Sequence, residues 1–248
     1  MNAFFMSFID AISFGRIDVH SHLLPDVDDG CPTVEESLKC VRRLIAAGYT
    51  HGFCTPHIWP NLPHNSVEQI AAKTRQLQLD IDAAGLNYRV MPGGELNVRP
   101  DLSDTPSEAV PTYGMARKYC LFDIWVDEIP KYFWTAAEWL QSLGLQVIVA
   151  HPERVRAVQD KPELAERFQE AGLLLQGNLQ CFGDPPRSHT RRIAERYLKE
   201  GRYFLLGSDT HNAAGLDIRL AGLENAIDLV GDAEIWRLTR DNPLKLIA

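Results

Sequence analysis

The chain has 248 residues and a mass of 27.9 kDa; 45% of its residues are hydrophobic and 23% are charged. These values are typical of an ordinary soluble protein, and the length suits one α/β barrel domain over residues 1–248. The net charge of −8 and the lack of a long basic run argue against a nucleic-acid-binding surface and favour a pocket that holds cations.

The N-terminal residues 1–14 are apolar, but they lack a basic start and a small-residue cleavage site. The segment is also too short to span a membrane. We therefore expect an N-terminal extension that forms a short helix packed on the barrel or on a partner. The five cysteines include no C-x-x-C pair, which favours a reduced, cytoplasmic chain. The sequence leaves the oligomeric state open, a homo-oligomer included.

The first motif is an Asp-x-His-x-His sequence at the end of an apolar approach, residues 16–19. In a β-strand, side chains at positions i and i+2 point the same way, so His20 and His22 can bind one ion. Two carboxylates, Asp28 and Asp29, follow in a short loop. By itself, the histidine pair is equally consistent with hydrogen-bonded residues of a protein core.

Further residues of metal-ligand type follow most of the later predicted strands. We expect these strands near residues 52–55, 88–91, 119–122, 146–150, 173–176 and 203–207. The residues that follow them are His57, Glu95, Asp123, His151, Asp209 and His211. Because the carboxyl ends of all strands in a parallel α/β barrel open onto one face, we expect these side chains to meet in one pocket.

Helix signals alternate with the predicted strands. Thr33 with Glu36, and Ser66 with Gln69, have the spacing of a capping box, so helices should begin at these two points. Later helices are expected over residues 132–143, 162–171 and 191–200, each followed by a glycine. With the approach at 16–19 counted, the alternation gives seven strands. We therefore predict an α/β fold, a distorted, TIM-like, seven-stranded (β/α) barrel with a metal site at the C-terminal face of the strands.

The strings DVHSHLLPDVDDG, TPH, GGE, AHPER and GSDTHN occur in this order along the chain. In these motifs the chain resembles the polymerase-and-histidinol-phosphatase (PHP) superfamily, and within it the bacterial capsular and exopolysaccharide tyrosine-protein phosphatases. The resemblance extends from about Gly15 to the closing Asp241-Asn242-Pro243. It implies a distorted barrel holding three divalent metals, which hydrolyses phosphotyrosine in the tail of a cytoplasmic tyrosine kinase that controls polysaccharide synthesis.

The resemblance also implies a set of metal ligands. One metal would be bound by His20, His22, Glu95 and Asp209, a second by Glu95, Asp123 and His151, with Glu95 as the bridge, and a third by Asp29, His57 and His211. Manganese ranks first on the resemblance alone. Mixed imidazole and carboxylate ligands are equally compatible with iron or zinc.

Arg154, His57 and His211 are the candidates for direct roles in catalysis. Arg154 matches the family's phosphate-binding arginine, and a guanidinium fork suits phosphate oxygens. The alternative for Arg154 is a surface salt bridge at the start of a helix. Tyrosine oxygen, with a phenolic pKa of about 10, is a tolerable leaving group, so a strong general acid is not required.

Two positions depart from the family pattern. Asp123 stands where the family usually has glutamate, which shortens this ligand by one methylene; Asp127 and Glu128 are alternative ligands close by. The family also commonly has a Gly-Arg pair for phosphate after the last histidine, and this chain lacks it. Arg219 is a possible substitute, although an exposed helix residue is at least as good an interpretation.

A competing motif, Cys181 followed by five residues and then Arg187-Ser188, fits the pattern of cysteine-dependent tyrosine phosphatases. A phosphate-binding loop of that kind needs successive backbone N–H groups, and the two prolines within the motif remove two of them. Asp184 would also repel a phosphate dianion. We interpret the segment as a turn after the sixth strand.

Two other functions stay open. One is a PHP-type phosphoesterase acting on a small phosphomonoester such as histidinol phosphate. The other is a non-catalytic metal-binding regulator, in which Asp123 and the missing Gly-Arg pair have abolished turnover. The aromatic residues expected on the rim of the pocket, where they would contact a tyrosine ring or pack on the barrel, are Trp125, Tyr132, Phe133 and Trp134.

Overall fold

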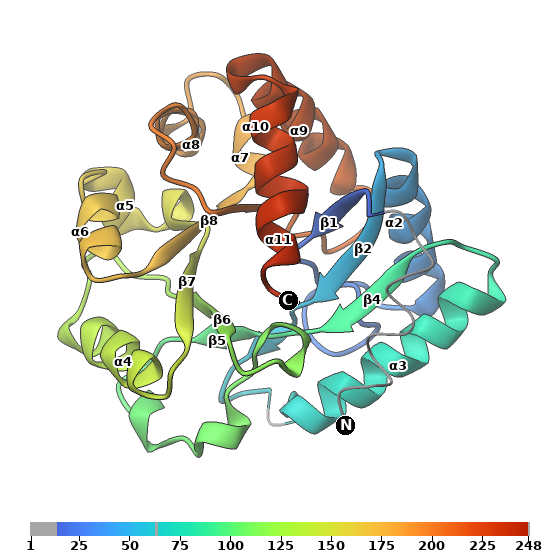
Figure 1. Ribbon diagram of the computed structural model, residues 1–248, viewed down its shortest axis with the longest axis horizontal. Helices are drawn as coiled ribbons and strands as arrows, with labels where there is room; N and C mark the ends of the chain where they lie inside the picture. The colour runs from blue at the N-terminus through green and yellow to red at the C-terminus, as the bar shows by residue number, and fades with distance from the viewer. Residues whose placement is uncertain (1–13, 63, 248) are drawn as a thin grey trace.

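The computed structural model describes residues 14–62 and 64–247, so the predicted N-terminal helix lies outside the described residues except for Phe14. The described chain is an α/β fold whose parallel strands curl into a half-barrel with helices around it (Figure 1). The strands are β1 (Arg16–Asp18), β2 (Tyr49–Cys54), β3 (His57–Ile58), β4 (Arg89–Pro92), β5 (Glu95–Asn97), β6 (Tyr119–Asp123), β7 (Gln146–Ala150), β8 (Leu174–Asn178) and β9 (Leu205–Gly207).

The helices alternate with these strands as the sequence predicted. They are α2 (Val34–Ala46), α3 (Val67–Ala83), α4 (Lys131–Ser142), α5 (Arg156–Asp160), α6 (Leu164–Glu170), α7 (Leu179–Gly183), α8 (His189–Lys199), α9 (Leu216–Val230), α10 (Asp232–Trp236) and α11 (Asn242–Leu244). Short turns of other helix types include η3 (Tyr113–Met115), η4 (Pro152–Arg154) and η5 (Arg237–Asp241). Within the described ranges, no helix is both long enough and apolar enough to cross a membrane.

The strands form two parallel sheets, with the orders β1-β2-β4 and β3-β5-β6-β7-β8-β9. The described chain therefore has nine strands and not the seven expected, because two of the predicted strands are each followed by a short second piece. Pro56 separates β2 from β3, and Gly93 with Gly94 separates β4 from β5. Proline has no N–H for a ladder, and a Cβ at Gly94 would lie only 2.6 Å from Pro111. Each break begins a new strand at a site residue, His57 or Glu95.

The first and last strands meet beyond their carboxyl ends. Ser21 and Thr210 form an isolated parallel bridge. The Asp209 N–H donates to His20 O at 2.7 Å, and the His22 N–H donates to Thr210 O at 2.8 Å. These bonds hold the two loops that carry His20, His22, Asp209 and His211 against each other.

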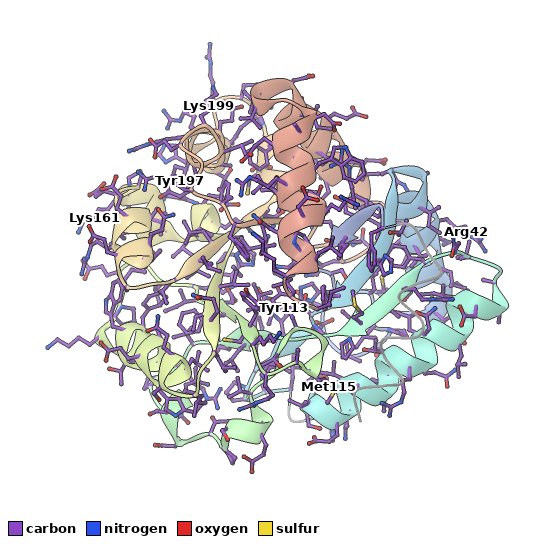
Figure 2. All side chains as sticks on the ribbon, in the orientation of Figure 1. Arg42, Tyr113, Met115, Lys161, Tyr197 and Lys199 are labelled. Carbon is purple, nitrogen blue, oxygen red and sulfur yellow. The ribbon has the colours of Figure 1, made fainter. Side chains whose placement is uncertain are left out.

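The opposite end of the half-barrel is covered by the C-terminal segment. Arg240 donates to Phe14 O, just before β1, and Asn242 donates to Phe204 O, just before β9. Leu246 is fully buried in the same cluster as Ile17 and Ile148 of the strands. Figure 2 shows Tyr113 among the side chains at the centre, whereas Arg42, Lys161 and Lys199 extend outward.

The helix caps predicted from the sequence are confirmed. The hydroxyls of Thr33 and Ser66 accept from the N–H groups of Glu36 and Gln69, both at 3.3 Å. The Glu36 carboxylate accepts from the Ala213 N–H at 2.8 Å, which ties α2 to the loop after β9. Helix α8 begins two residues earlier than predicted, at His189, because the Ser188 hydroxyl caps it.

Candidate metal centre

All nine residues predicted to bind metal lie in one cluster. His57 and Glu95 open β3 and β5, Asp123 closes β6, and the others lie in loops after β1, β7 and β9. The sequence suggested that His20 and His22 lie within the first strand, but both follow β1. Their Nε2 atoms nevertheless lie only 3.3 Å apart. A Cβ at Gly207 would lie 2.7 Å from His20 Cβ, so only glycine leaves room for this ring.

The first group of donor atoms consists of His20 Nε2, His22 Nε2, Glu95 Oε2 and Asp209 Oδ1. His20 Nε2 lies 3.5 Å from each of the two carboxylate oxygens, and His22 Nε2 lies 3.6 Å from Glu95 Oε2 and 3.3 Å from Asp209 Oδ1. An ion about 2.1 Å from four tetrahedral donors separates them by about 3.4 Å. These four donors therefore have the spacing of ligands to one ion.

The second group surrounds the other face of the Glu95 carboxylate. Glu95 Oε1 lies 3.0 Å from His151 Nε2, and Asp123 Oδ1 lies 3.9 Å from His151 Nδ1. His57 Nδ1 lies 2.8 Å from Glu95 Oε2, and His57, Glu95 and Asp123 form a compact set of donors. Glu95 therefore faces both groups, and its two oxygens have different neighbours.

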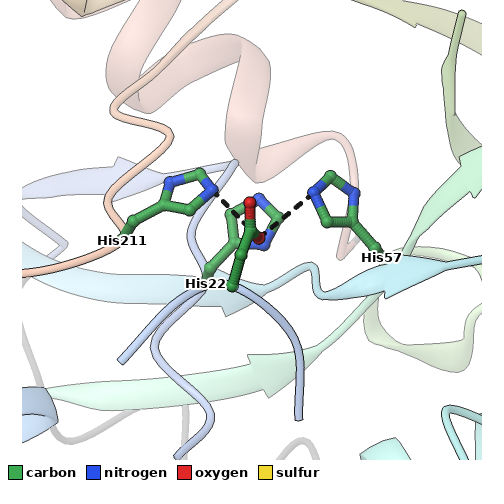
Figure 3. A group of neighbouring side chains, drawn as sticks. His22, His57 and His211 are labelled. Atoms are coloured by element: carbon green, nitrogen blue, oxygen red, sulfur yellow. Dashed lines mark ion pairs between the residues drawn. The ribbon is translucent and has the colours of Figure 1, made fainter. Parts of the chain in front are cut away.

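The third group lies at the mouth of the cluster. Asp29 Oδ1 is 3.4 Å from His57 Nε2 and 3.4 Å from His211 Nε2. Figure 3 shows His22, His57 and His211 pointing toward one another from separate elements. The His22 and His211 rings are stacked, with centroids 4.1 Å apart. His57 thus presents one ring nitrogen to Asp29 and the other to Glu95.

Several buried polar atoms of the cluster have no hydrogen-bond partner. They are Glu95 Oε2, both carboxylate oxygens of Asp123, His57 Nδ1 and His151 Nδ1. An unpaired buried carboxylate is costly, so such groups are normally paired or bound to a metal. His57 Nδ1 and Glu95 Oε2 lie 2.8 Å apart but lack hydrogen-bond geometry, so neither atom satisfies the other. The residues present therefore fit divalent cations.

The electrostatics of the cluster point to the same deficit of positive charge. Burial favours neutral histidine, but the neighbouring carboxylates Glu95 and Asp123 raise the pKa of His151 to about 9. Burial and the nearby Glu95 raise the pKa of Asp123 to about 6. Burial and the charge of His22 lower the pKa of His211, which favours its neutral ligand form. Without an ion, protons on His151 and Asp123 therefore offset negative charge that bound cations would otherwise neutralise.

Three polar residues that sequence reasoning did not assign orient the ligands. Asp28 Oδ2 accepts from His22 Nδ1 at 2.7 Å, and Gln176 Oε1 accepts from His20 Nδ1 at 2.9 Å. These bonds leave Nε2 of each ring free to bind an ion. Asn178 donates to Asp209 Oδ2 at 2.7 Å. The sequence signal was present, because Gln176 and Asn178 are polar residues two apart in an otherwise apolar strand.

Arg154 lies beside this cluster. Its Nη1 donates to Asp209 Oδ2 at 2.6 Å, and its guanidinium carbon lies 4.9 Å from the centre of the Trp125 ring. Asp209 Oδ2 is therefore occupied by two donors, which leaves Oδ1 to face His20 and His22. Arg154 is not a surface salt bridge, since its partner is a buried member of the cluster.

Two of the predicted ligands have uncommon backbone conformations. His151 has φ of 30° and Asp209 has φ of 55°, both in the left-handed region. Residues other than glycine rarely adopt such angles, and those that do are concentrated at functional sites. Glu153, two residues after His151, accepts from the N–H of Asn178 at 2.7 Å and from the Tyr203 hydroxyl at 3.0 Å. This buried carboxylate fixes the turn that carries both His151 and Arg154.

The structure corrects several other expectations. Arg219 is neither exposed nor in the cavity wall; it is buried and donates to the carbonyls of Ser208 and Asp209. Asp127 and Glu128 are exposed, and neither lines the cavity. Cys181 lies in α7 and not in a turn, because the Asn178 side chain caps this helix. Burial and the nearby Glu153 raise the pKa of Cys181 well above the usual range, so its thiol is a poor nucleophile.

Of the aromatic residues expected at the rim, Trp125 alone lines the cavity. It is half exposed, and its ring centroid lies 5.6 Å from that of His151. Phe133 and Trp134 pack on Phe168 in the core, and Tyr132 packs against the same core cluster. Trp59, which was not predicted, stacks on His57 with centroids 4.0 Å apart. The cavity between Trp59, Trp125, Arg154 and the cluster has a volume of about 110 Å³.

A family model described as capsular polysaccharide synthesis, CpsB/CapC, matches residues 16–248. Among curated proteins, the tyrosine-protein phosphatase YwqE of Bacillus subtilis is 26% identical over 200 residues, which is 79% of this chain and 77% of YwqE. The tyrosine-protein phosphatase CpsB of Streptococcus pneumoniae is 27% identical over 250 residues, which is 93% of this chain and 98% of CpsB.

The fold is also found among solved structures. A structure from the pair YwqE of Bacillus subtilis and CpsB of Streptococcus pneumoniae, described as metal-dependent tyrosine phosphatases, has a TM-score of 0.85 to this chain with 23% identity. The match covers 93% of this chain and 94% of the other. Since the family model covers nearly the whole sequence, the chain belongs to the CpsB/CapC family of capsular polysaccharide synthesis.

Proposed function

We propose that this member of the CpsB/CapC family is a metal-dependent protein-tyrosine phosphatase. Its substrate is phosphotyrosine on a cytoplasmic tyrosine kinase that controls capsular or exopolysaccharide synthesis. The observation that carries the proposal is the buried Glu95 carboxylate, which lies between two groups of histidine and aspartate donors with one oxygen unpaired. Arg154 stands beside this cluster; its Nη1 donates to Asp209, and its remaining N–H donors are left for a phosphate group.

We assign the donors to three divalent ions. His20, His22, Glu95 and Asp209 hold the first, Glu95, Asp123 and His151 hold the second, and Asp29, His57 and His211 hold the third. The distances around Glu95 support its bridging role, and the 3.4 Å between His57 Nε2 and Asp29 Oδ1 supports the place of His57 at the third ion. We rank manganese first, with iron or zinc as the alternatives that this ligand chemistry admits.

The chemistry follows from the position of the chain's own groups. Divalent ions held by this cluster would supply hydroxide at neutral pH and neutralise phosphoryl oxygens. Arg154, held by Asp209 and packed on Trp125, orients the phosphate group toward the cluster. His57 and His211 fix Asp29 at the mouth, where the phosphate enters. Phenolate leaves with modest assistance because the phenolic pKa is about 10, so the chain needs no dedicated strong acid.

The proposal also covers the domain architecture and the location of the protein. If β2 with β3 and β4 with β5 are each counted as one interrupted strand, the half-barrel has the seven strands expected of a distorted barrel. We infer that residues 1–248 form one such domain, with the metal site at the C-terminal face of the strands. We also place the protein in the cytoplasm, where its kinase substrate would be.

The test is a comparison of substrates for the manganese-loaded protein. We expect kcat/KM for a phosphotyrosine peptide to exceed kcat/KM for histidinol phosphate by at least about tenfold. Arg154→Lys should lower kcat/KM for the peptide about tenfold or more, because an ammonium group cannot form the bidentate contact. Preference for histidinol phosphate would favour a small-molecule phosphoesterase. A loaded protein with no hydrolysis of either compound would favour a non-catalytic regulator.

A further inference from the structure

A second, larger hollow adjoins the catalytic cavity. This groove has a volume of about 420 Å³ and shares Asp29, His57 and Trp59 with the wall of the 110 Å³ cavity. Its remaining wall comes from the loop after β1 and the loop after β3, including Asp26, Asn61 and Leu62. Trp59 forms a wall of both spaces while its ring stacks on His57. The two spaces are therefore neighbouring parts of one surface.

The sizes of the two spaces suggest different occupants. The smaller cavity corresponds to about four water molecules in volume, so it has no room for the residues that flank a phosphotyrosine. The groove is within the range of about 300–1,000 Å³ typical of ligand sites. If the phosphate group of a substrate binds against Arg154, the rest of the substrate must lie outside the smaller cavity. The groove beside Trp59 adjoins that cavity and can hold it.

The walls of the groove are apolar and acidic. Trp59 and Leu62 supply the apolar surface, and lysine and arginine are absent from the described lining. The Asp28 carboxylate is bound to His22, and Asp29 faces two histidines. Asp26 is exposed, and its carboxylate forms no hydrogen bond or ion pair with any described residue. One negative charge at the rim is thus left for a ligand.

We propose that this groove binds the polypeptide that flanks phosphotyrosine, and that Asp26 selects a basic residue in that flank. The proposal rests on the proposed function, since it names the class of phosphotyrosine substrate that the same site accepts. The aliphatic part of a lysine or arginine side chain packs on Leu62 and Trp59, and its charged end reaches the Asp26 carboxylate. An acidic flank meets the same carboxylate with like charge and binds less well.

Asp26→Asn isolates this charge without disturbing the loop. Asp26 has φ of 55°, a left-handed conformation that asparagine adopts as readily as aspartate. The matched control is Asp104→Asn, which removes the same charge from an exposed residue outside both lining sets. For the apolar wall, Leu62→Ala is paired with Leu79→Ala, since Leu79 is exposed on α3.

The experiment compares kcat/KM of the manganese-loaded protein for three compounds. These are a phosphotyrosine peptide flanked by lysines, the same peptide flanked by glutamates, and N-acetyl-phosphotyrosine amide, which has the same leaving group and no flanks. We expect the lysine peptide to exceed the glutamate peptide, and Asp26→Asn to lower this ratio about two- to fivefold, as for an exposed ion pair. Added salt should lower the ratio in the wild type as well.

Leu62→Ala should lower kcat/KM for the lysine peptide, relative to the flank-free amide, by about threefold or more. Leu79→Ala and Asp104→Asn should leave both ratios unchanged. The inference is overturned if the wild type shows no preference for lysine flanks, or if Asp26→Asn and Asp104→Asn have equal effects on it. Failure of the wild type to hydrolyse any of the three compounds would instead refute the proposed function.

Discussion

Asp28 and Asp29 are neighbours in the sequence, but their carboxylates have opposite surroundings. The Asp28 side chain is 1% exposed and bonds to His22 Nδ1 and to the N–H groups of Gly30 and His57. The Asp29 side chain is 66% exposed and faces the Nε2 atoms of His57 and His211. The first carboxylate holds ligands in place, whereas the second is placed to be a ligand itself.

This difference predicts different consequences for two conservative variants. Asp28→Asn should lower the free energy of unfolding of the metal-free protein by about 2 kcal/mol, because a buried carboxylate with three donors is lost. Asp29→Asn should change it by less than about 0.5 kcal/mol, as for most exposed positions. Urea denaturation of both variants at pH 7 checks the prediction. Equal destabilisation would show that Asp29 also supports the loop.

Hydrolysis should not depend on the Cys181 thiol. Cys181 is buried in α7, its pKa is raised by burial and by Glu153, and it does not line the cavity. We expect Cys181→Ser to retain kcat/KM for an aryl phosphate within about twofold, with any loss due to packing. Circular dichroism of the variant confirms folding. A folded Cys181→Ser protein without activity would require a cysteine mechanism.

Loss of Glu95 should affect metal content more than loss of a residue at the mouth. Glu95 Oε1 faces His151 while Oε2 faces His20 and His22, so its charge would serve both the first and the second of the proposed ions. Without it, those ions lose a shared negative partner and repel each other more strongly at short range. Elemental analysis should therefore find fewer ions per chain in Glu95→Gln than in His57→Ala. Full and equal occupancy in both variants would contradict the bridging role.

The second ion should be the most easily lost of the three, because Asp123 is one methylene shorter than the glutamate usual in the family. Both of its oxygens lack a partner, and Oδ1 lies 3.9 Å from the nearest nitrogen of His151. A side chain one methylene longer extends further from the end of β6 toward the cluster. We expect Asp123→Glu to tighten this site about tenfold in a manganese titration, without slower turnover. A variant that binds fewer ions or turns over more slowly would show that aspartate is required at this position.

The sequence was sufficient for features that depend on local spacing. The Thr33 and Ser66 caps need only the residue three positions later, and the candidate ligands recur just past apolar runs. The breaks at Pro56 and at Gly93-Gly94 were not predicted, because the short pieces β3 and β5 are defined by pairing with distant strands.

The partners of the ligands were predicted less well for the same reason. Arg219 looked like an exposed or phosphate-binding residue, yet α9 packs so that its guanidinium reaches the carbonyls after β9. The motif around Arg154 predicts its place beside the site. Its bond to Asp209 is not predicted, because the two residues are 55 positions apart in the sequence. Contacts of this kind follow from the packing of distant strands and helices and not from any local pattern.

The most direct test of the account is reconstitution of the metal-free protein. The chain is stripped of metal with a chelator, and manganese is then added stepwise while ions per chain and hydrolysis of a phosphotyrosine peptide are measured on the same samples. We expect no hydrolysis without metal, recovery as manganese binds, and saturation at about three ions per chain. Full hydrolysis by the metal-free chain, or full occupancy without hydrolysis, would contradict it.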